Sequence, residues 1–252
     1  MKKPKVPMKA FQNPVREFDR FASTYGHYSV IQRQAAEYLC SWIDGKELGC
    51  VVDLGCGDGA ILRQLKRREL GFEAFYGVDL SDSMLAIHPR SERVYCLRGD
   101  FNDKDFLQRL GGLAPDTILS SSALQWSRDP DETLGCLSRL GSASYFSIFT
   151  SGTFETLHRM AGISSPIRRF DTMEKILRKY YHVRRLERVH YRLHFESRNA
   201  IFRYIKRSGV SGGNARLSYR GIRRLMEEYP LDYLEFELLF ASLESRSSLS
   251  RS

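Results

Sequence analysis

The sequence predicts an α/β fold built on an open, mostly parallel sheet, and three observations carry that prediction. Five short apolar runs alternate with helical stretches, as in successive strand–helix–strand units; they are CVVDL, FEAFYGVDL, RVYCLRGD, DTILSSS and ASYFSIFTS. The first run ends at Asp53 and leads into Gly55, Gly57 and Gly59, a tight strand-to-helix turn. Two later runs, VHYRLHF and YLEFELLFASL, alternate apolar and polar residues as half-buried strands do, and we expect the last one at an edge.

The remaining segments read as helices and loops around this core. EFDRFASTYGHYSVIQRQAAEYL predicts one or two N-terminal helices, residues 152–185 read as helical, and YRGIRRLMEEYP predicts a helix that ends at Pro230. We predict one domain over residues 1–252. Its parts are an N-terminal helical cap (1–45), a core (50–150), a helical insertion (151–188) and a C-terminal part of the core (189–243).

The composition is that of a globular protein with a sizeable core, since 42% of the 252 residues are hydrophobic and 27% are charged. The opening MKKPKVPMKAFQNP has neither the pattern of a secretory signal nor that of a membrane span. The five cysteines form no CxxC pair, which favours reduced thiols that serve as packing residues. We therefore expect a cytoplasmic protein with no metal site and no membrane partner.

Positive charge is concentrated in one segment. Residues 160–224 carry 17 Lys and Arg against 4 Asp and Glu, whereas the net charge of the whole chain is only +9. Such a segment attracts an anionic partner, namely an acidic protein, a nucleic acid or a membrane surface. A solvated arginine-rich face with no partner remains the alternative.

Three successive predicted strands end in an acid, at Asp53, Asp79 and Asp100. Ligands of open parallel sheets bind outside the carboxyl ends of the strands, so these acids converge on one crevice. Asp79 stands where an acid accepts from a ribose diol, and Asp100 where one accepts from the exocyclic amine of adenine. Asp53 stands where an amino group or an ordered water is held. The glycines let a ligand approach the backbone closely.

The acids near the glycine turn also indicate which kind of nucleoside cofactor binds there. A dinucleotide site places a pyrophosphate over a helix N-terminus, but Asp53 and Asp58 would repel it here. They suit a ligand with an ammonium and a sulfonium, which is S-adenosylmethionine; a structural sheet with no ligand remains the alternative. The expected cofactor contacts are Asp53, Gly55, Cys56, Gly57, Gly59, Asp79, Leu80, Ser81, Met84, Asp100, Phe101 and Ser121.

The order hhD-hGxGxG, an acid at the end of the second strand and then GDF resembles the pattern of class I S-adenosylmethionine-dependent methyltransferases. That likeness implies a Rossmann-like sheet of seven strands, mostly parallel, with the last strand antiparallel. Further motifs resemble the malonyl-acyl carrier protein methyltransferases of biotin synthesis (the BioC family), from about Phe18 to Leu243. They are SSSALQW (residues 120–126), SGVSGGNA, the closing LEFELLFASL, and an N-terminal pattern made by Phe18, Arg20, Ala22, Tyr25, Gln32 and Arg33.

Two positions depart from the BioC pattern. Ser121 stands where that family tends to have Asn, and Phe21 replaces a usual small residue. Neither departure removes a group that the chemistry requires. The cofactor contact at the end of the fourth strand is the one that the change at Ser121 affects.

The resemblance implies methyl transfer to the free carboxylate of a malonyl thioester on acyl carrier protein, giving the methyl ester that primes biotin synthesis. A carboxylate is already ionised near neutral pH, so the reaction needs no general base. We expect Tyr25, Gln125 and Trp126 to form walls of the cavity, and Arg169 or else Arg33 to hold the malonyl carboxylate.

The basic segment would then attract the acidic carrier protein. Nucleic acid is a less favoured partner, because SSSALQW lacks the Asn/Asp-Pro-Pro-aromatic motif used on exocyclic amines and the chain has no Pro-Cys nucleophile. Two alternatives to the implied reaction remain. One is another small-molecule or RNA methyltransferase, and the other is a non-catalytic module that binds S-adenosylmethionine or RNA.

Overall fold

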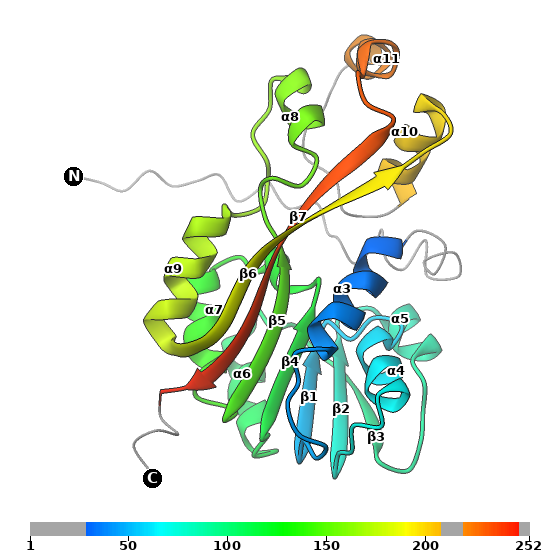
Figure 1. Ribbon diagram of the computed structural model, residues 1–252. Helices are drawn as coiled ribbons and strands as arrows, with labels where there is room; N and C mark the ends of the chain where they lie inside the picture. The colour runs from blue at the N-terminus through cyan, green and yellow to red at the C-terminus, as the bar shows by residue number, and fades with distance from the viewer. Residues whose placement is uncertain (1–28, 208–218, 247–252) are drawn as a thin grey trace, which may run out of the picture.

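The computed structural model describes residues 29–207 and 219–246, and it contains one seven-stranded sheet (Figure 1). The strand order is β3-β2-β1-β4-β5-β7-β6. The strands are β1 (Cys50–Leu54), β2 (Ala74–Asp79), β3 (Val94–Arg98), β4 (Thr117–Ser121), β5 (Ala143–Phe149), β6 (Tyr181–His194) and β7 (Tyr233–Ser245).

Strands β1 to β5 pair in parallel, whereas β7 runs antiparallel to both of its neighbours, β5 and β6. The predicted fold class, a mostly parallel sheet whose last strand is reversed, is confirmed. The strand order reverses between β1 and β4, so the carboxyl ends of these two strands lie side by side. That is the position at which open α/β sheets bind ligands.

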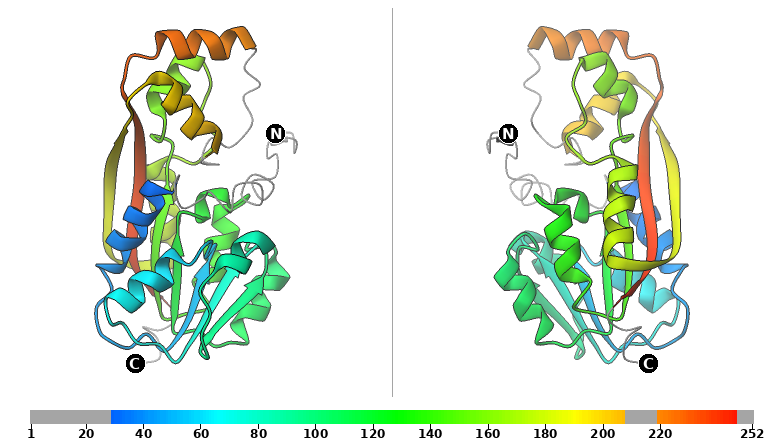
Figure 2. Two further views of the ribbon diagram at one scale, coloured as in Figure 1. Left: turned by 90° about the vertical axis from the view of Figure 1, so that its right-hand side faces the viewer. Right: turned by 90° about the vertical axis from the view of Figure 1, so that its left-hand side faces the viewer.

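Helices cover both faces of the sheet (Figure 2). One face carries α3 (Val30–Cys40) and α4 (Ala60–Arg67), and the other carries α6 (Lys104–Gly111), α7 (Pro130–Leu137) and α9 (Phe170–Tyr180). A short α5 (Asp82–Ile87) follows β2, and a 3-10 turn, η2 (Leu124–Trp126), follows β4. Buried aliphatic side chains of these helices meet the sheet on each face, as the period of 3.6 residues requires.

The upper part of β6 and β7 rises beyond the carboxyl ends of the parallel strands (Figure 1). It carries α8 (Glu155–Ala161), α10 (Arg198–Arg207) and α11 (Tyr219–Glu228), and we call this assembly the arm. Its aromatic side chains continue the core of the sheet, because Phe236 of β7 packs 5.1 Å from Phe154 and 6.3 Å from Tyr204 between ring centroids. The arm is therefore joined to the sheet by an apolar layer as well as by two strands.

Two expectations about the last strands are wrong. Residues 152–185 form α8 and α9 as predicted, but the chain turns into β6 already at Tyr181. A register shift between Val183 and Arg185 breaks the alternation of apolar and polar residues there, which hides the first part of the strand. The last strand, β7, is not an edge strand either, since it lies between β5 and β6.

The edge of the sheet beside β7 is β6, whose exposed side chains are arginines and histidines. Charged side chains along an edge oppose pairing with another chain. Residues Phe18 to Tyr28 and the loop SGVSGGNA lie outside the described residues, and the predicted domain boundaries stay a prediction. In the part of the chain that the structure describes, no helix has the length and apolar character to cross a bilayer.

Phe240 of β7 holds α3 on the sheet, since its fully buried ring packs against Tyr38 at 5.0 Å and Trp42 at 5.9 Å between ring centroids. Phe240→Ala is expected to lower the free energy of unfolding by about 3–5 kcal/mol, because it removes buried surface and leaves a cavity. Urea unfolding measures the change. The control Ile87→Ala, at a side chain that is 48% exposed, should change it by less than about 0.5 kcal/mol. Equal effects of the two substitutions would contradict this account of the α3 contact.

Candidate functional site

A pocket lies where α3 meets the carboxyl ends of β1 and β4. The residues that line it are Ser29, Gln32, Arg33, Asp53, Gly55, Cys56, Gly57, Asp58, Ala60, Ile61 and Ser121. Its volume is about 30 Å³, room for about two water molecules. The pocket therefore fits a small polar or charged group, and a larger ligand has to extend from it across the ends of neighbouring strands.

The glycine turn after β1 forms the floor of this pocket. A Cβ atom at Gly55 would stand 2.2 Å from the Cβ of Ala123, so the turn has to be bare there for the chain beyond β4 to pack. At Gly57 a Cβ would meet only open space, the nearest atom being the carbonyl oxygen of Gly55 at 4.0 Å. The backbone at Gly57, with φ of 52°, therefore lies open to an approaching ligand.

Asp53 is the most unusual residue of the site. Its side chain is 1% exposed, and neither carboxylate oxygen has a hydrogen-bond partner in the described structure. Burial, and next the charge of Asp79, raise the pKa of Asp53 well above its usual value. An ionised carboxylate in such a place is costly unless a cation or a strong donor reaches it. By contrast, Asp58 pairs with Arg63 at 2.7 Å, so its charge is already compensated.

Asp79, at the end of β2, ties the glycine turn to the next loop. Its two carboxylate oxygens accept from the backbone N–H groups of Gly57 and Ser81, each at 2.9 Å. A carboxylate oxygen can accept more than one hydrogen bond, so these contacts are compatible with the predicted binding of a diol. The Ser81 hydroxyl caps α5 by accepting from the N–H of Met84, and Ser81 and Met84 are both buried. Leu80, between these loops, is half-buried.

Asp100 is more constrained than the sequence suggests. Its Oδ1 accepts from the backbone and side-chain amides of Asn102, and its Oδ2 pairs with Arg128 at 2.8 Å. An adenine amine at this carboxylate would have to share it with Arg128. The neighbouring Phe101 is half-buried and packs against the core of the α6–α7–α9 face.

Beyond β4 the chain bends sharply and buries several polar atoms. The Ser121 hydroxyl pairs with that of Ser147 at 2.9 Å, and Gln125 donates to the carbonyl of Ser122 at 2.6 Å. The Oε1 atom of Gln125 and the hydroxyl of Ser122 are buried with no described partner. Ser122 adopts a positive φ of 60°, which favours Gly, Asn or Asp over Ser. Trp126 follows within the same turn, η2.

The two candidate arginines lie in different places. Arg33, from α3, lines the pocket together with Asp53. Arg169 is not among the lining residues; it precedes α9, its side chain is 78% exposed, and it lies 3.7 Å from Asp171. Tyr25, the third residue expected at the substrate, lies outside the described residues.

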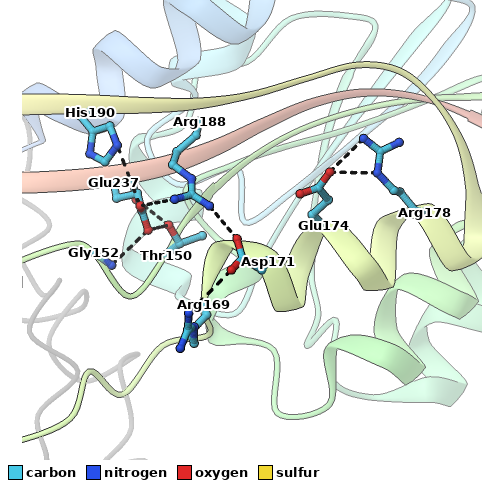
Figure 3. A network of polar contacts seen from close by, with 9 residues as sticks. All are labelled: Thr150, Gly152, Arg169, Asp171, Glu174, Arg178, Arg188, His190 and Glu237. Carbon is cyan, nitrogen blue, oxygen red and sulfur yellow. Dashed lines mark hydrogen bonds and ion pairs between the residues drawn. The ribbon is translucent and has the colours of Figure 1, made fainter.

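Arg169 ends a chain of charges that crosses from the arm to α9 (Figure 3). Glu237 of β7 is 7% exposed and accepts from the Thr150 hydroxyl at 2.5 Å and the Gly152 amide at 3.2 Å. Arg188 of β6 lies 3.7 Å from Glu237 and 2.7 Å from Asp171. The network therefore fixes the loop after β5 between the arm and α9.

Three residues of these sites were not among the predicted site residues. Gln32 and Ser122 entered the sequence analysis only as letters of family-like motifs, and Glu237 was not singled out. Gln32 is 9% exposed, its Oε1 has no described partner, and it faces the pocket beside Arg33. Among the described residues, no group of His, Cys, Asp or Glu is arranged to hold a metal ion. Cys56 lines the pocket but is buried, and burial raises the pKa of its thiol, so it is not a ready nucleophile.

Comparison with known proteins gives a consistent result. A family described as a methyltransferase domain matches residues 52–142. A malonyl-[acyl-carrier protein] O-methyltransferase of Chlorobium luteolum is 26% identical over 209 residues, which are 77% of this chain and 78% of that protein. The enzyme of the same name from Acinetobacter baylyi is 21% identical over 88% of both chains. The one from Bacteroides fragilis is 27% identical over 78% of this chain, which spans only 41% of that protein.

Solved structures show the same fold at low identity. An S-adenosylmethionine-dependent methyltransferase from Anabaena variabilis has a TM-score of 0.56 and 14% identity, with 98% of both chains covered. A phosphoethanolamine N-methyltransferase from Haemonchus contortus, solved with S-adenosyl-L-methionine, has a TM-score of 0.55 and 17% identity over 98% of this chain and 63% of its own.

The comparisons and the geometry agree on the family. The strand order with a reversed β7 is the one that the class I pattern implies, and the glycine turn lies at the point where the order reverses. The matched residues include Asp53 of β1, Asp79 of β2 and Asp100, which follows β3. The resemblance seen in the sequence is thus confirmed, and we conclude that this chain has the class I fold and contains a methyltransferase domain, similar to the malonyl-acyl carrier protein O-methyltransferases.

Proposed function

We propose that this enzyme transfers the methyl group of S-adenosylmethionine to the free carboxylate of a malonyl group carried on acyl carrier protein, and that the methyl ester serves biotin synthesis. The observation that carries the proposal is the agreement of curated relatives of that name over 77–88% of the chain. The geometry supports the donor, because the buried Asp53 provides a site for a cationic group.

Residues of the pocket, and residues at the ends of the neighbouring strands β2 and β3, suit the methyl donor as a bound group. Asp53 of the pocket would meet its ammonium, and Gly57 leaves room for close approach. Outside the pocket, Asp79 would meet its ribose and Asp100 with Phe101 its adenine. When bound, S-adenosylmethionine supplies a methyl group on a positively charged sulfur. The remaining work of the protein is to bind, to orient and to exclude water.

The acceptor needs little chemical help. A malonyl carboxylate is ionised near neutral pH, so a general base is unnecessary, and none of the described residues lining the pocket is a histidine. We propose that Tyr25, Gln125 and Trp126 shape the acceptor cavity and that Arg169 holds its carboxylate. Arg169 suits that part because its contact with Asp171, at 3.7 Å, is longer than a charge-assisted hydrogen bond.

The carrier protein is the proposed partner, and the cytoplasm the proposed location. Exposed arginines of β6 and α9 present positive charge beside the sheet, which would steer an acidic carrier toward it. Several of them are partly neutralised within the chain, since Arg184 pairs with Glu244, Arg178 with Glu174 and Arg188 with Asp171. RNA responds to the same charge, so a second candidate function is RNA methylation.

The reaction itself is the first test. Incubation with malonyl-acyl carrier protein and methyl-labelled S-adenosylmethionine should place label on the carrier in a base-labile ester, whereas carrier bearing an acetyl group should take up none. Labelled carrier is separated from free donor and treated with mild alkali. Absence of label on the malonyl carrier would refute the proposed acceptor, and label on total RNA would favour the second function.

Asp53→Asn tests whether the buried carboxylate lowers the stability of the ligand-free protein. Because burial raises the folded-state pKa of Asp53 above the ordinary 3.8, the ionised form costs stability at higher pH and the protonated form does not. The ligand-free variant should therefore melt above the wild type at pH 7, by about 2–4 °C for each kcal/mol relieved. The difference should shrink as the pH falls toward 4.

Cofactor binding should change in the opposite direction. The variant loses the charge that meets the donor's ammonium, so S-adenosylmethionine should raise its melting temperature less than that of the wild type. Differential scanning fluorimetry with and without the donor measures both effects. A variant that is less stable at pH 7, or that keeps the full ligand shift, would contradict the assignment of Asp53.

Arg169→Ala tests the acceptor clamp. The variant should bind S-adenosylmethionine as the wild type does, because Arg169 lies outside the pocket, but should lose roughly 10- to 100-fold in kcat/KM for malonyl carrier. Arg67→Ala is the control, since it removes an equally charged, exposed side chain of α4, away from the arginines of β6 and α9. Turnover that survives Arg169→Ala would place the clamp elsewhere.

A further inference from the structure

Helix α3 is tied to the edge strand β6 by one carboxylate, that of Glu187. Its Oε2 accepts a hydrogen bond from the Tyr38 phenol at 2.6 Å, and its Oε1 accepts from the Nε of Arg185 at 3.0 Å. The Arg185 guanidinium in turn lies over the Trp42 ring, 3.9 Å from its centroid. Glu187 therefore contacts α3 directly through Tyr38, and reaches the turn after α3 through Arg185 and Trp42. We call these four residues the α3 clamp.

A register shift in β6 directs the clamp toward α3. Residues two apart in a regular strand share a face of the sheet. Val183 packs on the face of α6, α7 and α9, yet Arg185 contacts Trp42 on the face of α3. The shift between Val183 and Arg185 changes the face, as a β-bulge does. The irregularity that interrupts the strand pattern thus places Arg185 beside Glu187.

The clamp is a charged contact. The hydrogen bond from Tyr38, and next the one from Arg185, lower the pKa of Glu187 below its usual value. The carboxylate is therefore ionised at neutral pH, and hydrogen bonds to an ionised acceptor are shorter and stronger than neutral ones. The Glu187 side chain is 36% exposed, so water screens part of this attraction.

The apolar packing of α3 leaves much of its placement to such contacts. Ala35 and Ala36 are fully buried at the centre of the helix. They let α3 lie close to the sheet, but their short side chains make few interlocking contacts with it. The orientation of α3 therefore depends on larger side chains such as Leu39 and on the clamp at the C-terminal end of the helix.

The opposite end of α3 forms a wall of the pocket at the end of β1. Ser29, Gln32 and Arg33 line that pocket together with the glycine turn. Tyr38 follows Gln32 by six residues, about 9 Å along the helix axis. Because a hydrogen-bonded helix of this length moves as one body, a displacement at Tyr38 also moves the pocket wall.

We infer that Glu187 is a positioning residue for the methyl-donor site, although it lies outside the pocket on the edge strand β6. By holding Tyr38, and Trp42 through Arg185, it sets the position of α3 and of the pocket residues in the first turn of that helix. The inference rests on the methyl donor of the proposed function but is independent of the malonyl acceptor.

Tyr38→Phe and Glu187→Ala test the inference, because each breaks the bond between phenol and carboxylate. Each should raise the dissociation constant for S-adenosylmethionine roughly 3- to 10-fold, the loss expected when a hydrogen-bonded contact of the site is weakened. The double variant should bind as Glu187→Ala does, since the Tyr38 hydroxyl then has no partner left to lose. Isothermal titration calorimetry gives the dissociation constants.

A conservative variant separates positioning from a merely structural part. Glu187→Gln keeps an oxygen that accepts from Tyr38, so its dissociation constant should stay within about twofold of the wild-type value. Glu174→Ala is the matched control, since it removes another carboxylate paired with an arginine, but from α9 on the opposite face of the sheet. The two glutamate side chains are similarly exposed, 30% for Glu174 and 36% for Glu187. The control should bind the donor as the wild type does.

Variants of the clamp that melt at a lower temperature but keep the wild-type affinity would overturn the inference, because Glu187 would then serve stability alone. Equal losses of affinity in Glu187→Ala and Glu174→Ala would overturn it as well. Tyr38→Phe decides the matter even if Glu187→Ala does not fold. If the wild type binds no S-adenosylmethionine, the donor of the proposed function fails and the inference fails with it. If the clamp variants lose affinity as expected but malonyl carrier is not methylated, the inference holds and only the proposed acceptor fails.

Discussion

The site depends on one unfavourable feature, a buried carboxylate at the carboxyl end of β1 that has no hydrogen-bond partner among the described residues. Asp53 lies at the point where the strand order reverses, and Asp79 adds a second negative charge nearby. The sheet tolerates this arrangement because β1 is hydrogen-bonded on both sides and its neighbours are buried aliphatic residues. A cationic ligand would compensate the buried charge of Asp53. The same charge that favours binding therefore lowers the stability of the ligand-free protein.

Much of this could be predicted from the sequence, because the signals are local. The acid before a bare glycine turn and the apolar runs of β1 to β5 depend on neighbouring residues only. The beginning of β6 could not be found in this way, since a register shift between Val183 and Arg185 disrupts the two-residue period that marks a strand. Nor does alternation distinguish β7 from an edge strand, because a strand's neighbours are set by contacts distant in sequence.

The sequence predicts which residues belong to the candidate site but not which of them contact one another. Asp100 reads as an open acceptor, yet Arg128, which follows β4, occupies one of its oxygens at 2.8 Å. The sequence does not tell whether Arg33 or Arg169 lies in a pocket. The packing of α3 places Arg33 in the pocket, whereas Arg169 lies on the surface. Ion pairs between distant segments leave no periodic signal, which is why composition predicted a basic face but not its internal neutralisation.

That neutralisation changes what the basic segment can do. Arg188 reaches Asp171 at 2.7 Å, stacks on Phe170 at 3.9 Å and lies 3.7 Å from the buried Glu237, so it is a structural cation that joins β6, β7 and α9. The loop after β5 is bonded to the same Glu237, whereas the pocket at the end of β1 is lined by residues of α3, β1 and β4. The charge network of Glu237 and the pocket of Asp53 are therefore two separate systems. The two systems share no described residue. The effects on ligand affinity of a substitution in one and a substitution in the other should therefore be nearly additive.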